Sequence, residues 1–219
     1  MRFWRLSSVT LGVLIGRFYK VAGSNGRIEI HPLGEARWPS CLARHAANCL
    51  TAGMALSYKI ATLLYCFNER DEVLLLERAQ EPNLGLWSPP GGKLKTDVGE
   101  SPYMCACREA QEEMGLELAP ADLHLTGLVS EHGYQGAAHW LMFLFEVKPR
   151  LKSPPPPMRE GRFEFFPKSA LAGLRLPETD VETIWPMFWQ HRGGFFAAHC
   201  HCFEDGRNEW TVEESKTPR

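Results

Sequence analysis

Three absences narrow what this sequence can be. No apolar stretch in its basic first segment is long enough to cross a bilayer, which takes about 20 residues, because the longest runs only from Leu6 to Gly16. The formal net charge is −2, so the chain lacks the basic field expected of a partner of nucleic-acid polymers. The seven cysteines are odd in number and irregularly spaced. We therefore expect reduced thiols in a cytoplasmic protein without a membrane span, and no disulfide framework.

The composition that remains is that of an ordinary globular protein. Hydrophobic residues make up 44% and charged residues 23% of the 219 positions, close to the averages for soluble domains. This length accommodates one domain with additional segments, or two very small domains. The charge is unevenly distributed, since residues 1–53 contain seven basic and two acidic side chains, whereas residues 54–219 contain 17 basic and 24 acidic ones.

The origin of residues 1–53 stays open between three interpretations. Arg2 and Arg5 before the apolar stretch are typical of a secretory signal, although no convincing A-x-A cleavage site follows. The arginine-rich, acid-poor composition also resembles that of a transit peptide. We favour the third interpretation, in which these residues are an extension or a non-native start, because the pattern becomes regularly globular from Met54.

From Met54 onward, the hydrophobic and turn residues predict strands and helices in alternation. Tyr58–Phe67 and Glu72–Arg78 are apolar, strand-like runs joined by a polar turn, which predicts a hairpin. Further elements are expected in this order: a helix at 102–114, strands at 123–130, 139–147 and 162–166, a last helix at 179–190, and a polar, loosely ordered tail at 203–219.

The helix at 102–114 carries three glutamates on one face. Glu109, Glu112 and Glu113 stand at positions i, i+3 and i+4, which share a helix face. Like charges one turn apart repel each other, and the C-terminal half of a helix disfavours anions. Carboxylates held together against both effects indicate a divalent cation such as Mg²⁺ or Mn²⁺, both of which take hard oxygen ligands. The alternative is a solvated acidic face.

The surrounding sequence favours the cation. Residues 91–116 read GGKLKTDVGESPYMCACREAQEEMGL. This stretch resembles the Nudix box, in which a glycine, five residues, a glutamate and seven residues precede R-E-U-x-E-E-x-G-U, with U an aliphatic residue. Arg108 through Leu116 match position by position, and the spacing from Glu100 to Arg108 agrees. The stretch departs from the pattern between Gly92 and Glu100, where seven residues replace five; the insertion lies in a loop, where added length costs little.

The resemblance to the Nudix hydrolases, and to MutT-like members in particular, implies a fold and an activity. The fold is a single α/β/α sandwich with a mixed β-sheet, expected over residues 54–202. The activity is metal-dependent hydrolysis of a nucleoside diphosphate linked to another moiety, with a small nucleotide-type substrate. By position, Glu109, Glu112 and Glu113 would bind the metal together with the Gly92 carbonyl. Arg108 would orient the glutamates, and one glutamate would activate the attacking water.

Residues outside the box are candidates for substrate contacts. Trp87 and Trp140 are aromatic side chains able to stack on a base, although aromatics in strands more often belong to the core. Glu160 and Glu164 are candidates for an additional carboxylate, against the alternative of plain surface residues. The His199–Cys202 run has alternating neighbours that cannot all face one tetrahedral ion in a regular strand, so we expect no zinc site there.

A non-enzymatic function is the main alternative. A Nudix-type domain that binds a nucleotide as a sensor often lacks box glutamates, whereas this chain has Glu100, Glu109, Glu112 and Glu113. That difference favours the enzyme. The identity of the nucleoside does not follow from the box, because other strands and loops recognise it.

Overall fold

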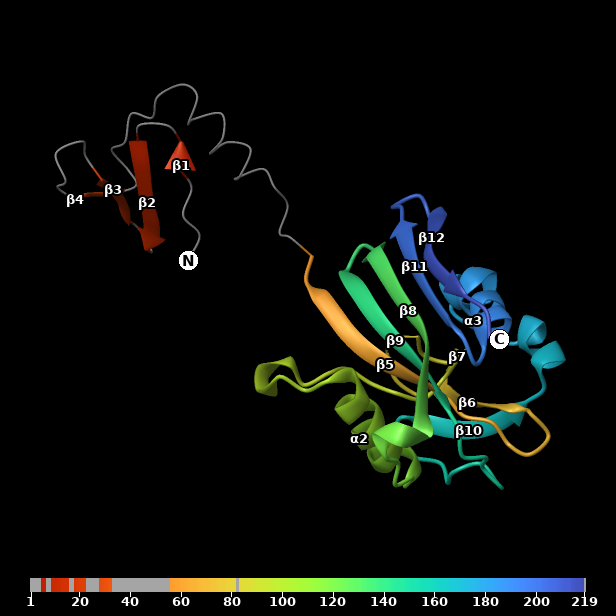
Figure 1. The fold of residues 1–219 in the computed structure, drawn as a ribbon. Helices are drawn as coiled ribbons and strands as arrows, with labels where there is room; N and C mark the ends of the chain where they lie inside the picture. Colours follow the sequence, from red (N-terminus) through yellow and green to blue (C-terminus); the bar gives the residue numbers. More distant parts are fainter. Residues whose placement is uncertain are drawn as a thin grey trace. The chain divides into compact units, whose positions relative to one another are not determined.

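The structure, a computed structural model, describes residues 56–81 and 83–218 in full. Of the first 55 residues it describes four strands, β1 (Arg5–Leu6), β2 (Val9–Ile15), β3 (Phe18–Ala22) and β4 (Ile28–Pro32). These strands pair in the order β1-β2-β3-β4 (Figure 1). The chain divides into two compact units, Met1–Ala55 and Leu56–Arg219. Whether residues 1–53 are a targeting segment or an extension lies outside what the structure describes.

A five-stranded mixed sheet forms the centre of the second unit. Its order is β12-β11-β8-β9-β5. The strands are β5 (Tyr58–Tyr65), β8 (Leu123–Tyr134), β9 (Ala138–Val147), β11 (Phe195–Cys202) and β12 (Asn208–Lys216). β5 pairs with β9 and β11 pairs with β8 in parallel, whereas the β8–β9 and β11–β12 pairs are antiparallel. The predicted mixed sheet is therefore confirmed.

A smaller antiparallel sheet and two α-helices complete this unit. The sheet has the order β10-β6-β7, with β6 (Val73–Arg78), β7 (Trp87–Ser88) and β10 (Gly161–Phe166). The α-helices are α2 (Pro102–Met114) and α3 (Trp185–His191). Short helical turns are η1 (Thr96–Val98), η2 (Pro120–Asp122), η3 (Lys168–Gly173) and the π-helical η4 (Asp180–Ile184).

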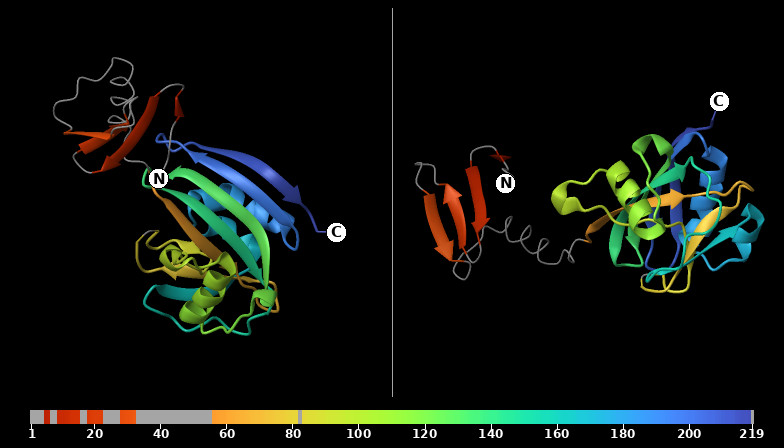
Figure 2. Two further views of the ribbon diagram at one scale, coloured as in Figure 1. Left: turned by 60° about the vertical axis from the view of Figure 1, so that its left-hand side comes forward. Right: turned by 90° about the horizontal axis from the view of Figure 1, so that it is seen from below.

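The two helices cover opposite sides of the strands. In β5, the side chain of Leu64 packs into a core with Ala106 and Ala110 of α2, whereas that of its neighbour Tyr65 packs into a core with Phe188 of α3. Successive side chains of a strand point to opposite faces, so each face has its own helix. α2 contacts β5 and α3 contacts β8 and β11 (Figures 1 and 2). The layers confirm the predicted α/β/α sandwich.

The bounds of α2 agree with those predicted from its capping residues. The Ser101 side chain accepts a hydrogen bond from the Met104 amide at 3.2 Å and so satisfies one free N–H of the first turn. At the other end Gly115 has φ 67°, and its N–H donates to the Gln111 carbonyl. A left-handed residue is the usual way to end a helix, and glycine adopts it without strain.

One expectation about the strands holds only at a turn, and another is wrong. The two runs of the expected hairpin pair at the turn, where Phe67 and Val73 form an antiparallel bridge. Beyond it, β5 and β6 belong to different sheets. β5 instead pairs along its whole length with β9. The tail expected to be loosely ordered contains β12, whose side chains are mostly exposed. Its polar composition suits an edge strand that is open to solvent on its outer side.

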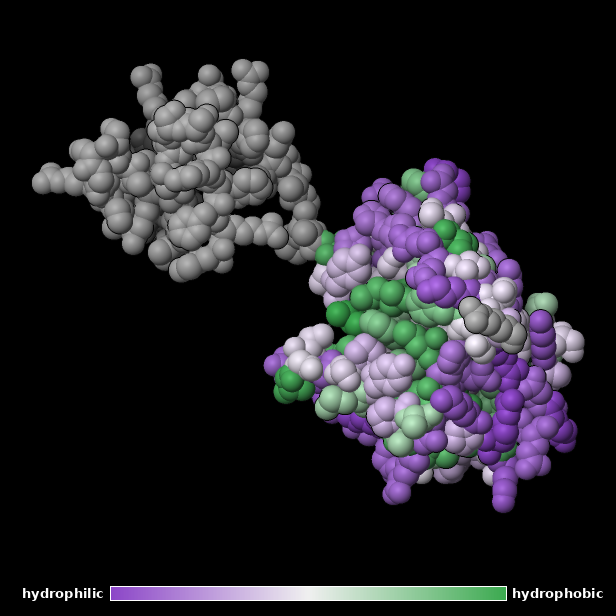
Figure 3. Space-filling model, in the orientation of Figure 1, coloured by the Kyte–Doolittle hydropathy of each residue, from purple (hydrophilic) through white to green (hydrophobic). Residues whose placement is uncertain are grey.

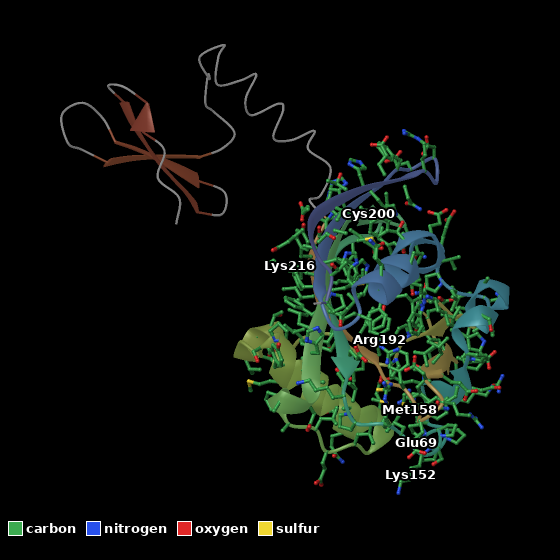
Figure 4. All side chains as sticks on the ribbon, turned by 45° about the vertical axis from the view of Figure 1, so that its right-hand side comes forward. Glu69, Lys152, Met158, Arg192, Cys200 and Lys216 are labelled. Atoms are coloured by element: carbon green, nitrogen blue, oxygen red, sulfur yellow. The ribbon has the colours of Figure 1, made fainter. Side chains whose placement is uncertain are left out.

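The last predicted helix, at 179–190, consists of a π-helical segment and an α-helix. The π-helical η4 runs directly into α3, and Pro186 is the second residue of α3. Beyond α3, the Arg192 side chain (labelled in Figure 4) donates two hydrogen bonds to Asp71, at 2.7 and 2.8 Å, and one to Glu146 at 2.8 Å. Arg192 thus fixes the end of α3 to β9 and to the turn before β6.

Candidate active site

A cavity of about 550 Å³ lies between the mixed sheet, the loop before α2 and the glutamate face of α2. This volume is in the range of small-molecule sites. Its walls include residues from strands β5, β8 and β9, from α2, and from the loop that contains Gly91 and Gly92, called the glycine loop. The lining residues include Lys59, Thr62, Gly91, Gly92, Lys93, Lys95, Arg108, Glu109, Glu113, Glu131, Trp140, Glu160, Thr179 and Asp180. On the face shown in Figure 3, hydrophobic side chains form a band over β5 and β9, bordered by hydrophilic ones.

The glycine loop runs alongside β5 and leaves no room for side chains. The Thr62 amide donates to the Gly92 carbonyl at 2.9 Å, and the Leu64 amide donates to the Pro90 carbonyl at 2.8 Å. Gly91 has φ 139°, and a Cβ there would collide with the Thr62 carbonyl; a Cβ on Gly92 would collide with the Glu109 carboxylate. The two glycines are therefore required by close approach, one to a strand and the other to a glutamate.

The Gly92 carbonyl is a predicted metal ligand, so the direction in which its oxygen points matters. Its oxygen accepts the Thr62 N–H and lies 3.7 Å from Cys105 Sγ. One of its two lone pairs is thus used in pairing with β5. The loop is anchored to β5 again at Leu94, whose amide donates to the Ile60 carbonyl at 3.0 Å.

Arg108 is the centre of a charged network on α2. Its guanidinium donates to both carboxylate oxygens of Glu100, from Nε at 2.7 Å and from Nη2 at 2.9 Å. Its Nη1 donates to Glu109 at 2.6 Å and to Glu112 at 2.9 Å. The fork of the guanidinium matches a carboxylate in this bidentate way. Arg108 therefore holds three box glutamates in fixed relation to each other.

The carboxyl groups of the site differ in their pKa. Hydrogen bonds from Arg108 hold the pKa of Glu100 at about 2. Burial raises the pKa of Glu109, and it raises the pKa of Glu113 to about 8 despite the Gly91 amide, which donates to Glu113 at 2.8 Å. The negative charges of Glu109 and Glu160 also raise the pKa of Glu113. A positive charge entering the cavity would stabilise the ionised form of Glu113.

A second acidic pair lies in the wall of the same cavity. Glu131 of β8 and Asp180 of η4 are 3% and 8% exposed. Burial raises the pKa of Glu131 to about 7. Burial, followed by the charge of Glu131, raises the pKa of Asp180 to about 8. These two acids were not predicted as site residues. The available signals were the polar run Glu178–Asp180 after Leu176-Pro177, and an acid at the end of an apolar strand.

The structure brings some predicted site residues together and separates others. Arg108, Glu109, Glu113 and Gly92 line the cavity, as does Trp140. Glu112 stays largely exposed and pairs with Arg108 and Lys95.

Two predicted substrate contacts lie away from the cavity. Trp87 is 7% exposed and packs edge-on against Phe166 in the core, with ring centroids 4.8 Å apart. Glu164 of β10 is exposed and pairs with Arg162 at 3.3 Å. Its candidate partner Glu160 does line the cavity. A residue's place in a strand does not reveal which face of the sheet it reaches, which explains why Trp87 and Trp140 differ. Glu160 lies in the turn before β10, whereas Glu164 lies within that strand.

The His199–Cys202 run forms part of β11, with its residues alternating between faces. His199 Nδ1 is bonded to Ser130 at 2.7 Å, and the sulfur atoms of Cys200 and Cys202 are 3.7 Å apart. Across residues 56–81 and 83–218, no three His, Cys, Asp or Glu side chains converge closely enough to hold a metal ion as they stand.

Comparison with known proteins is consistent with this geometry. A family model described as NUDIX domain matches residues 57–188. The 8-oxo-dGDP phosphatase NUDT18 of Mus musculus is 35% identical over 140 residues, which are 62% of this chain and 37% of the mouse protein. The chain thus spans little more than a third of that relative's length.

Two solved structures share the fold. The crystal structure of a MutT protein from Bacillus halodurans has a TM-score of 0.56 and 23% identity, and the match covers 71% of this chain and 97% of that one. The MutT protein from Methanosarcina mazei Go1 has a TM-score of 0.52 and 24% identity over 62% and 96% of the two chains. Within the part of the chain that the structure describes, no helix combines the length and apolar character needed to span a membrane.

Proposed function

The chain belongs to the NUDIX domain family, and on that premise we propose that it hydrolyses a phosphoanhydride bond in a nucleoside diphosphate derivative. The observation that carries the proposal is the position of Glu109 and Glu113. Both carboxylates line a 550 Å³ cavity beneath the glycine loop, and Arg108 fixes the orientation of Glu109 by a 2.6 Å hydrogen bond. This arrangement offers anionic oxygens at one end of a cavity large enough for a nucleotide.

The donor atoms of the site fit Mg²⁺ or Mn²⁺ in kind. Glu109 and Glu113 supply hard carboxylate oxygens, with Glu112 and the Gly92 carbonyl as further donors. The half-buried Glu113 accepts the Gly91 N–H, and burial raises its pKa, so a bound cation would stabilise its ionised form. Glu109 and Glu112 are both engaged by Arg108, so we propose that a cation takes the place of some of these hydrogen bonds. When bound, it would neutralise phosphate oxygens and acidify a water molecule.

Other residues of the site would attract the substrate, orient the glutamates and accept a proton. Lys59, Lys93 and Lys95 line the cavity and would attract the anionic substrate. Arg108 would orient Glu109 and Glu112 through charge-assisted hydrogen bonds. A carboxylate among Glu109, Glu112 and Glu113 would take the proton from the attacking water.

The mouse relative is named for an oxidised guanine nucleotide, so the substrate panel that tests the proposal should include 8-oxo-dGDP beside ordinary nucleoside di- and triphosphates. We expect hydrolysis with Mg²⁺ or Mn²⁺, products identified by mass spectrometry, and loss of activity in EDTA that is restored by excess metal. Full activity in EDTA would contradict the metal requirement. Nucleotide binding without turnover across the panel would contradict the enzyme and support the sensor alternative. A cytoplasmic location stays a prediction.

A further inference from the structure

We propose that a groove formed by η3, η4 and α3 binds the proline-rich segment 153–157 of a second copy of this chain, so that two copies exchange these segments in a dimer. The groove has a volume of about 480 Å³ and shares no lining residue with the cavity that contains the box glutamates. The inference therefore goes beyond the proposed hydrolase function and does not depend on it.

The groove is lined mainly by apolar and aromatic side chains. The rings of Trp185 and Trp189 stack with their centroids 6.0 Å apart and an angle of 26° between their planes. Val181 of η4 lies on the same groove and is 42% exposed. Lys168 lies at its edge, with Nζ 5.0 Å from the ring centre of Trp189. Exposed apolar surface with a polar rim is typical of an interaction site.

Two hydrogen-bond donors of the groove lack acceptors. The buried indole Nε1 atoms of Trp185 and Trp189 have no hydrogen-bond partner among the residues that the structure describes. An indole N–H can only donate, and the Lys168 ammonium group adds a further donor. A buried donor without an acceptor costs about 1–3 kcal/mol, and most buried polar atoms are paired. The groove therefore favours a ligand that is rich in acceptors.

The chain itself contains a segment that offers acceptors without donors. Residues 152–158 read KSPPPPM, and the four prolines have carbonyl oxygens but no N–H. Consecutive prolines adopt the extended polyproline II helix, whose backbone forms no internal hydrogen bonds. Because this helix is already formed before binding, aromatic-lined grooves recognise it at a low cost in conformational entropy. The chemistry of the segment thus complements that of the groove.

The segment does not occupy the groove of its own chain. Backbone hydrogen bonds of the Leu151 and Met158 amides, each 2.9 Å long, anchor its two ends (Met158 is labelled in Figure 4). Three of its four prolines are exposed, and none of residues 152–158 lines the groove. A second copy therefore supplies the occupant. Because each copy has one groove and one segment, a reciprocal exchange closes a two-fold symmetric dimer.

Sedimentation of the full chain over a range of concentrations tests this dimer, and we expect reversible association. Val181→Glu places a charge in the groove at an exposed position, and the double variant Pro155→Ala/Pro156→Ala removes two rings from the segment. Each should raise the dimer dissociation constant at least about 10-fold. The matched control is Val212→Glu in β12, where the valine is 49% exposed and lies outside the groove. It should leave the dissociation constant unchanged.

A mixture of the two variants separates the exchange from a loss of folding. The Val181→Glu chain keeps an intact segment and the proline variant keeps an intact groove, so their mixture retains one of the two contacts. It should associate more strongly than either variant alone, with melting temperatures confirming that both are folded. A synthetic peptide of residues 152–158 should compete with the dimer, whereas the same peptide with Pro155→Ala and Pro156→Ala should not.

Three results would overturn the proposal. One is a wild type that stays monomeric at every concentration, and another is a dimer that persists unchanged in both variants. The third is binding of the peptide by a chain that does not dimerise, which would assign the groove to a proline-rich segment of another protein. None of these results bears on the hydrolase activity, which is measured separately.

Discussion

Glu113 of α2 accepts a hydrogen bond from the backbone amide of Gly91 at 2.8 Å. This bond joins the glutamate face of the helix directly to the glycine loop. Burial raises the pKa of Glu113 to about 8, while the hydrogen bond from the Gly91 amide acts in the opposite direction. The loop and the helix are therefore held together at this point. The ionisation of Glu113 depends on the charge of any group that enters the cavity.

Glu113→Gln keeps the size of the side chain and an oxygen able to accept the Gly91 N–H, but it removes the charge. If Glu113 binds the metal, kcat in saturating Mg²⁺ should fall by two or more orders of magnitude, equivalent to about 3 kcal/mol of transition-state stabilisation. The melting temperature of the metal-free protein should stay the same or rise slightly, because burial favours the uncharged form of this side chain, which glutamine resembles.

The matched control is Glu117→Gln, which neutralises an exposed glutamate just beyond the helix. It should leave both kcat and the melting temperature unchanged. Near-normal turnover of Glu113→Gln in saturating Mg²⁺ would exclude Glu113 from the metal site and leave Glu109 and Glu112 as its only helix carboxylates.

The ion pair of Glu100 with Arg108 should make stability depend on pH in the acid range. The pKa of Glu100 is about 2 in the folded protein because Arg108 donates two hydrogen bonds to it, and it is about 4.3 in an unfolded chain. The folded form thus binds fewer protons between these values. The stabilisation is present above about pH 4.3 and is lost as the pH falls toward 2.

Chemical denaturation between pH 2 and pH 6 measures this effect. Glu100→Gln should be less stable than the wild type at pH 6, and the difference should shrink as the pH falls. A constant difference over the whole range would show that the ionisation of Glu100 does not contribute. Arg108→Lys provides a complementary variant, because a lysine cannot make the bidentate contact.

Much of the site could be predicted because its signals are local. The cap of α2 depends on Ser101 and Gly115, which adjoin the helix, and the shared face of Glu109 and Glu113 follows from helical periodicity alone. The loop glycines could also be inferred from their neighbours. Each of these features depends on residues that are close in the chain.

The remaining features depend on pairing between distant segments. Glu131 lies in β8 and Asp180 in η4, and both line one cavity. The arrangement of the strands brings them together, and no local sequence pattern specifies that arrangement. The expected hairpin is limited to its turn for the same reason, since β5 pairs with β9, far along the chain. Trp87 and Trp140 look alike in sequence, yet one lies in the core and the other in the cavity.

Removal of residues 1–55 tests the division of the chain into domains. The boundary between Ala55 and Leu56 separates two compact units, and both cores of the second unit are built from residues beyond it. We expect the shortened protein to be soluble, to unfold in a single cooperative transition and to retain the activity of the full chain. Loss of cooperative unfolding would show that residues 1–55 contribute to the core of the second unit.

The adjacent glycines Gly91 and Gly92 should fail in different ways when each is replaced by alanine. At Gly91 the added Cβ would collide with the backbone carbonyl of Thr62, and the φ of 139° is unfavourable for any L side chain. Because the obstacle is backbone of β5, the loop must detach or the strand must move. Gly91→Ala should therefore lower the free energy of unfolding by about 3 kcal/mol.

At Gly92 the three atoms nearest to an added Cβ all belong to the carboxylate of Glu109, a side chain that can rotate away. Gly92→Ala should therefore change the free energy of unfolding by less than about 1 kcal/mol, but lower kcat 10-fold or more because Glu109 leaves its position beside Arg108; small displacements in a site are known to cost about this much. Denaturant titration and steady-state kinetics on both variants check the contrast. A destabilised Gly92→Ala with normal kcat per folded molecule would show that the Glu109 position is not required for turnover.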